Sequence, residues 1–279
     1  MTITAPPTTT PVPTTAGPIG DRPSTRSNDD DVKAIPAVLT SEWIKLSSLR
    51  SNKAILALTL AIAGFTSWAV ATLVTDEVLT VSEVFVHPTW LVAVLAAIAS
   101  ILLFTSEVHH GTLATTLAAQ PTRWVIAVTK TMMAIAVGLA LGAVGMIAGV
   151  VGSVTGGLEV GDTSAMAATT LWALLFTSLA AVLGLGVGMI VGHSAGAISG
   201  LLVWSFGVEN LVLAFAPPKV VHFLPFDAGY RLLGIGSDFD RAELIEAALT
   251  RPQYALIFGG YAMIALVVGT VLLYRRDAS

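Results

Sequence analysis

Six long apolar segments constrain the fold of this chain more than any other feature of its sequence. A helix rises about 1.5 Å per residue, so about 20 apolar residues cross the roughly 30 Å hydrocarbon core of a bilayer. Segments this long and this apolar predict an all-α integral membrane protein with six transmembrane helices. The expected spans are residues 54–74, 89–106, 125–154, 165–191, 195–216 and 254–274.

The composition supports a bilayer and excludes several other classes of protein. Only 11% of the 279 residues are charged, whereas a soluble domain carries about 25%. The formal net charge of -4 at pH 7 argues against a nucleic-acid-binding protein, which needs a basic face. Cysteine is absent, which excludes a disulfide scaffold and thiolate metal sites.

Two segments of different character precede the first span. Residues 1–33 are rich in proline and threonine and contain six of the 13 prolines, between Pro6 and Pro23. This composition is typical of disorder, and we expect a disordered cytoplasmic tail. Residues 34–53 repeat apolar side chains such as Ile35, Leu39 and Trp43 at helical spacing. They predict an amphipathic helix along the inner membrane surface, ahead of a transmembrane domain over 54–279.

The distribution of charge predicts the orientation, because basic loops stay in the cytoplasm. The first and third loops carry only acidic charges, so they are expected outside and both termini inside. The basic residues on the inner side are Arg22, Arg26, Lys33, Lys45, Arg50, Lys53, Arg123, Lys130, Arg275 and Arg276.

A short outer-loop helix is expected near Asp240 and Glu243, whose spacing fits a capping box.

Glycines recur at spacings of three and four in two places, which predicts helix faces that another backbone can approach closely. Such faces serve either ordinary packing within one subunit or a sliding or dimer surface, and the spacing is compatible with both. The first set is Gly138, Gly142, Gly145, Gly149, Gly152 and Gly156, and the second is Gly184, Gly188, Gly192, Gly196 and Gly200.

The segment Gly192-His193-Ser194-Ala195-Gly196 matches the GxSxG pattern of a hydrolase nucleophile elbow. That chemistry needs a strand-to-helix turn, an oxyanion hole and a downstream acid and histidine. Here the segment joins two apolar helical segments, and the later His222 is expected on the opposite side of the membrane. We interpret the segment as a turn between spans, and we expect no catalytic site and no metal site in the chain.

Two ionisable residues fall within the expected spans. Glu209 lies about 21 Å along the fifth span from its inner end, since each helical residue adds about 1.5 Å. A carboxylate at this depth is costly and is therefore a functional candidate. The alternative is a protonated or hydrogen-bonded side chain near the outer interface. Lys130 is expected to extend to the inner surface along its own aliphatic stem.

Several short motifs, in this order and spacing, resemble the membrane subunit of an ABC-2 type transporter in its actinobacterial drug-exporter-like branch. The resemblance covers about residues 36–276. The motifs are Ser41-Glu42-Trp43-Ile44-Lys45-Leu46, then Glu107-Val108-His109-His110-Gly111-Thr112-Leu113 with Pro121-Thr122-Arg123 and Lys130, the glycine-rich end of the fourth span, and Phe223-Leu224-Pro225-Phe226 before the last span.

The resemblance implies a multi-pass permease of the bacterial plasma membrane that pairs with a second copy or a paralogue. It also implies two copies of a separately encoded ATPase that bind ATP and magnesium, while this chain binds no cofactor. Substrate-path or gating residues are expected at Glu209, from its depth in the fifth span, and at Pro225 and Phe226, in the motif before the last span. The residues expected to couple to the ATPase are Glu42, Lys45, Glu107, Gly111, Thr112, Arg123 and Lys130.

The expected function is an ATP-driven exporter permease that moves an apolar or amphiphilic substrate. One alternative is a proton-coupled secondary transporter that uses Glu209, although such carriers usually show internal repeats and broken helices, and no repeat is visible here. The other alternative is a non-transporting membrane assembly or immunity protein.

Overall fold

The computed structural model describes residues 35–36, 39–41, 44, 50–74, 79–109, 111, 123–234 and 248–276. All regular structure within these ranges is helical, and six helices are long and apolar enough to cross a bilayer. The predicted all-α class and number of spans are therefore confirmed at this level. The spanning helices are α2 (Arg50–Leu73), α4 (Thr89–His109), α6 (Arg123–Thr155), α7 (Met166–Val191), the α8–η1–α9 series (Ser194–Leu202, Val203–Val208, Glu209–Phe215) and α13 (Arg251–Arg276).

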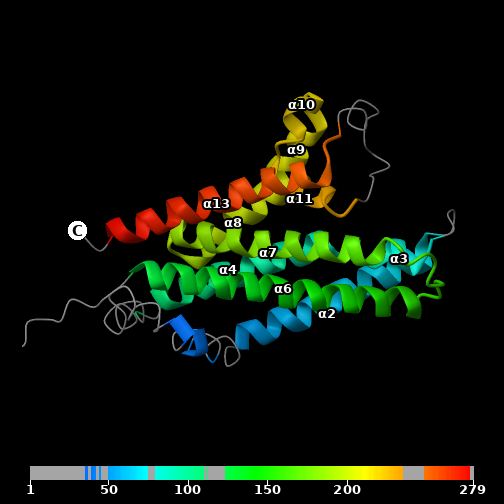
Figure 1. The fold of residues 1–279 in the computed structure, drawn as a ribbon, viewed down its shortest axis with the longest axis horizontal. Helices are drawn as coiled ribbons and strands as arrows, with labels where there is room; N and C mark the ends of the chain where they lie inside the picture. Colours follow the sequence, from blue (N-terminus) through cyan, green and yellow to red (C-terminus); the bar gives the residue numbers. More distant parts are fainter. Residues whose placement is uncertain are drawn as a thin grey trace, which may run out of the picture.

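Helix α7 lies at the centre of the bundle, where α4, α6 and α13 pack along it and α2 packs on α6 (Figure 1). α7 is apolar on all sides, as a helix in the middle of a bundle must be. Its aromatic core is shared with α13, where the Phe176 and Phe258 rings meet edge to face with centroids 5.3 Å apart. By contrast, about half of the residues of α2 and of the α8–η1–α9 series are exposed, and few are buried.

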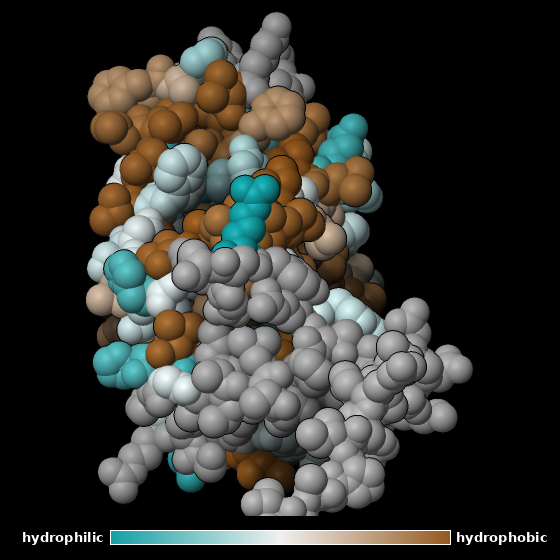
Figure 2. Space-filling model, turned by 90° about the vertical axis from the view of Figure 1, so that its left-hand side faces the viewer, coloured by the Kyte–Doolittle hydropathy of each residue, from teal (hydrophilic) through white to brown (hydrophobic). Residues whose placement is uncertain are grey.

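The periphery of the bundle exposes large hydrophobic side chains rather than polar ones. Phe65 of α2, Leu171 of α7 and Leu256 of α13 are each about two-thirds exposed or more. Figure 2 shows hydrophobic residues over much of the described surface at the end of the molecule where α13 terminates. So much exposed apolar surface is unusual for a soluble monomer and fits a chain surrounded by lipid.

The glycines of α6 and α7 contact neighbouring helices of the same chain. A Cβ at Gly138 would overlap the α7 backbone at Ser178, and one at Gly184 would overlap the α4 backbone at Ala97. The remaining α6 glycines lie against α7, α4, the turn after α3 and α2 in succession. Of the two interpretations of these faces, ordinary packing within one subunit accounts for these contacts. The second glycine set is not one continuous face, because α7 ends at Val191 and its C-cap, Gly192, has a φ of +79°.

Three short helices connect the spans: α3 (Val81–Val84), α10 (Pro218–Val221) and α11 (Pro225–Arg231). A capping box at Thr80 and Glu83 starts α3, and Pro225 occupies the first turn of α11. The helix expected near Asp240 and Glu243 lies outside the described residues, as does the 1–33 tail. In the expected 34–53 helix, residues 35–36, 39–41, 44 and 50–53 are described and helical.

Candidate functional site

The fifth span contains a π-helical segment, η1, between two α-helical segments. The backbone N–H of Glu209 donates to the carbonyl of Trp204, five residues earlier. The same spacing is repeated by side chains, because the indole Nε1 of Trp204 donates to Glu209 Oε1 at 2.8 Å. Five residues correspond to about 500° in an α-helix, which would leave these side chains about 140° apart. The π turn therefore brings the indole and the carboxylate together.

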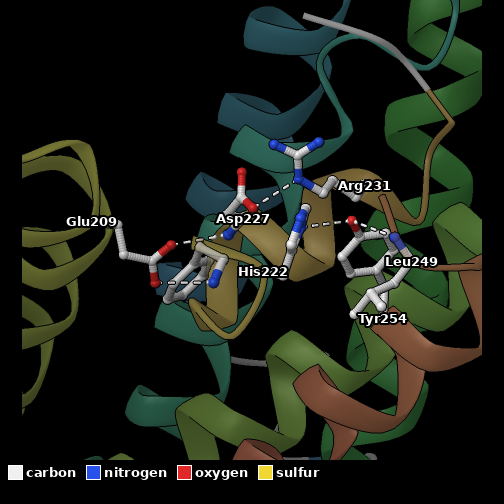
Figure 3. A network of polar contacts seen from close by, with 7 residues as sticks. Glu209, His222, Asp227, Arg231, Leu249 and Tyr254 are labelled. Carbon is white, nitrogen blue, oxygen red and sulfur yellow. Dashed lines mark hydrogen bonds and ion pairs between the residues drawn. The ribbon is translucent and has the colours of Figure 1, made fainter. Parts of the chain in front are cut away.

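The Glu209 carboxylate binds the first turn of α11. Its Oε1 accepts the backbone N–H of Phe226 and its Oε2 accepts that of Asp227, both at 2.9 Å. Figure 3 shows the carboxylate facing the start of this helix. Pro225, which has no N–H to satisfy, occupies the preceding position. The side chain of Glu209 thus supplies the cap that the first residues of α11 lack.

These contacts explain how an acidic residue is tolerated within an apolar span. Glu209 is only 2% exposed, and burial of an unpaired carboxylate costs far more than burial of a bonded one. Three N–H donors surround it, and the positive end of a helix adds to their effect. The hydrogen bonds expected under the second interpretation of Glu209 are present, and they are compatible with a functional role as well.

The structure brings the three expected gating residues together. Glu209 contacts the backbone at Phe226, and Pro225 is buried beside it. The Phe226 ring lies 5.9 Å from the ring of Phe258 on α13. Glu209, Pro225 and Phe226 therefore form one unit that joins the fifth span, α11 and the last span.

Further polar contacts hold the other side of α11 (Figure 3). Asp227 and Arg231 form an ion pair at 2.8 Å along the helix. The hydroxyl of Tyr254 accepts the backbone N–H of Leu249 at 3.1 Å and lies 3.0 Å from His222 Nδ1. The hydroxyl therefore contacts both the backbone of Leu249 and the ring of His222. The turn before α11 is thereby tied to the start of α13.

A buried ion pair joins the C-terminal end of α4 to the N-terminal part of α6. Lys130 Nζ lies 2.9 Å from Glu107 Oε2, and the two side chains are 1% and 8% exposed. The expectation that Lys130 extends to the surface is wrong, because its ammonium group is directed at a carboxylate on the neighbouring helix. Two residues expected to couple to an ATPase are therefore in direct contact.

The other expected coupling residues are placed only in part. Gly111 follows α4 with a φ of +68°, and a Cβ there would meet nothing within 4 Å. Arg123 begins α6, and nothing is described of its side chain. Glu42, Lys45 and Thr112 lie outside the described residues.

The GxSxG segment forms a turn between two helices, as the sequence predicts. α7 ends at Val191, and α8 begins at Ser194. His193 caps α8, with its Nδ1 accepting the backbone N–H of Gly196 at 3.0 Å. No strand precedes the serine in the described chain, so the strand-to-helix elbow is missing. Within the same described ranges, no group of three His, Asp or Glu side chains is placed to hold a metal ion.

Sequence reasoning missed the π segment, the α11 helix and the contact between His222 and Tyr254. A signal for α11 exists, because Pro225 followed by Asp227 is a typical helix start. The other two features depend on contacts between distant residues. Comparison of the chain with known protein families and with curated proteins gives no match.

Proposed function

We propose that this chain is the transmembrane permease subunit of an ATP-driven exporter of the ABC-2 type. It moves an apolar or amphiphilic substrate by alternating access, and a separately encoded ATPase supplies the energy. The observation that carries the proposal is the buried ion pair between Glu107 and Lys130. It lies where a transmitted force would have to enter the bundle.

The ion pair joins the two helices on either side of residues 110–122. Glu107 is two residues before the end of α4, and Lys130 is seven residues after the start of α6. A partner that binds residues 110–122 differently in two nucleotide states would shift the helices through those differential contacts. A buried pair makes α4 and α6 respond together, because separating the charges leaves each without its partner in an apolar setting.

The proposed partners are those that the resemblance to an ABC-2 type membrane subunit implies. Two ATPase copies would contact the cytoplasmic loops of two permease subunits, either two copies of this chain or this chain and a paralogue. ATP and magnesium would be bound by the ATPase. The expected location is the bacterial plasma membrane, with both termini in the cytoplasm.

The Glu209 geometry favours an exporter over a proton-coupled carrier. A carrier carboxylate has to exchange its proton during each cycle, whereas both oxygens of Glu209 accept backbone N–H groups of α11. Through these contacts Glu209 positions the start of α11. A proton uncoupler applied at constant ATP separates the two functions, because only the carrier would stop.

The test is a charge exchange across the ion pair. We expect Glu107→Lys to insert normally but to lose ATP-dependent export of a lipophilic dye from vesicles, since two ammonium groups would then face each other. The double variant Glu107→Lys/Lys130→Glu should recover part of the transport. Glu159→Lys, at an exposed loop position, is the matched control and should transport normally. Normal transport by Glu107→Lys would overturn the coupling role.

A further inference from the structure

We propose that the π segment Val203–Val208 is a register switch in the fifth span, and that Glu209 is the latch through which it holds or releases α11. In the observed state the π turn directs the carboxylate at α11. In the alternative state the segment becomes α-helical and the carboxylate turns away. Glu209 is therefore a positioning residue. The role of this switch in transport rests on the proposed function, whereas the switch itself does not.

The first argument is that the π geometry and the latch depend on each other. The backbone bond from Glu209 to Trp204 and the bond between their side chains both span five residues. The Asn210 side chain donates to the carbonyl of Phe206 at 3.0 Å and lies 3.4 Å from that of Ser205, so it spans both the four- and the five-residue spacing. Single-turn π segments are rare and occur frequently at functional sites. Here the segment also creates the side-chain alignment by which α11 is capped.

The second argument is that the end of the span beyond η1 has freedom to rotate. In α9, Leu211 is 63% exposed and Phe215 is 81% exposed. Figure 1 shows α9 and α10 extending away from the rest of the bundle. Conversion of one π turn to an α turn changes the register by one residue, which rotates the following segment by about 100°. Little tertiary packing of α9 opposes this rotation.

The third argument is that α11 would lose the hydrogen bonds at its first turn if Glu209 turned away. α11 is tightly packed on its inner side, where Ala228 is fully buried and Gly229 lies against the Phe176 ring. The Glu209 carboxylate reaches α11 across 17 and 18 residues of sequence. When the carboxylate turns away, two N–H groups at the start of α11 lose their acceptor. Water then becomes the available acceptor, so the release should open the α11 region to solvent.

The test removes one residue from the π segment. Deletion of Gly207 shortens the segment to α-helical register, and Gly207→Ala is the matched control because a Cβ at this position meets nothing within 4 Å. Glu209→Ala removes the latch without changing the register. The chain has no cysteine of its own, so Ala228→Cys reports the opening of α11. Ala173→Cys, fully buried in the same core, reports general unfolding.

Each variant is placed in lipid nanodiscs, and the rate of maleimide labelling is measured. We expect the Gly207 deletion and Glu209→Ala to increase labelling at position 228 about tenfold or more, since losing hydrogen bonds to a charged group shifts an equilibrium by at least this factor. Labelling at position 173 and labelling of Gly207→Ala should not change. Unchanged labelling at 228, or an equal increase at 228 and 173, would overturn the proposal. The expected labelling, together with no ATP-driven transport by the unsubstituted chain, would overturn only the proposed function.

Discussion

The ion pair between Glu107 and Lys130 provides a quantitative test of how α4 and α6 are joined. For two unit charges 2.9 Å apart, Coulomb's law at an effective dielectric constant of about 20 gives an attraction of about 6 kcal/mol. Removing both charges from water offsets much of this attraction. Loss of one partner leaves an uncompensated charge, which costs about 3–5 kcal/mol, whereas loss of both costs far less.

The variants are Lys130→Met, Glu107→Gln and the double substitution, measured as a double-mutant cycle. Unfolding by increasing SDS in mixed micelles, followed by tryptophan fluorescence, gives the free energy of each variant. We expect Lys130→Met to lose about 3–5 kcal/mol and the double variant to recover at least about 2 kcal/mol of that loss, a coupling in the range of contacting residues. Additive effects of the two substitutions would refute a direct energetic link between the helices.

Three further predictions concern the packing and the polar contacts. Gly184→Val should lower thermal stability in detergent, because its side chain would collide with the α4 backbone, while Gly260→Ala, where a Cβ meets nothing within 4 Å, should not. Tyr254→Phe should cost about 1–3 kcal/mol in SDS unfolding, the penalty for buried groups that lose a partner. The Ser164 backbone N–H and hydroxyl lower the pKa of Asp162. These hydrogen bonds favour ionised Asp162, so they stabilise the folded chain above the ordinary pKa of an aspartate, and the stabilisation is lost as the pH falls through the lowered pKa. Ser164→Ala removes the hydroxyl and should therefore raise the pKa of Asp162 in a carboxyl NMR titration.

The spans could be predicted from the sequence because the bilayer imposes both their length and their apolar composition. The predicted 125–154 and 165–191 spans differ from α6 and α7 by at most two residues at either end. The glycine spacing likewise indicated close helix approach. It could not identify the partner, because Gly138 and Gly184 contact different helices and spacing within one helix carries no information about its neighbours.

The residues of the candidate site could be named from the sequence, but their contacts with one another could not. Glu209 stands out in the sequence as an acid within an apolar span. Its alignment with Trp204 requires a π turn, for which the apolar pattern has no distinct signal. Lys130 was expected at the surface because its own helix permits this. The carboxylate that holds it inside belongs to α4, 23 positions earlier in the chain.

The most direct test of the central claim is purification of the tagged chain from its native membranes in a mild detergent. The eluate is assayed for a co-purifying P-loop ATPase and for vanadate-sensitive ATP hydrolysis, with Glu107→Lys as the matched variant. If the chain is an exporter permease, an ATPase should co-purify with it in stoichiometric amount and hydrolyse ATP. In the Glu107→Lys variant, this hydrolysis should no longer drive transport by the chain. A chain that purifies alone and without hydrolysis in several detergents would contradict the account.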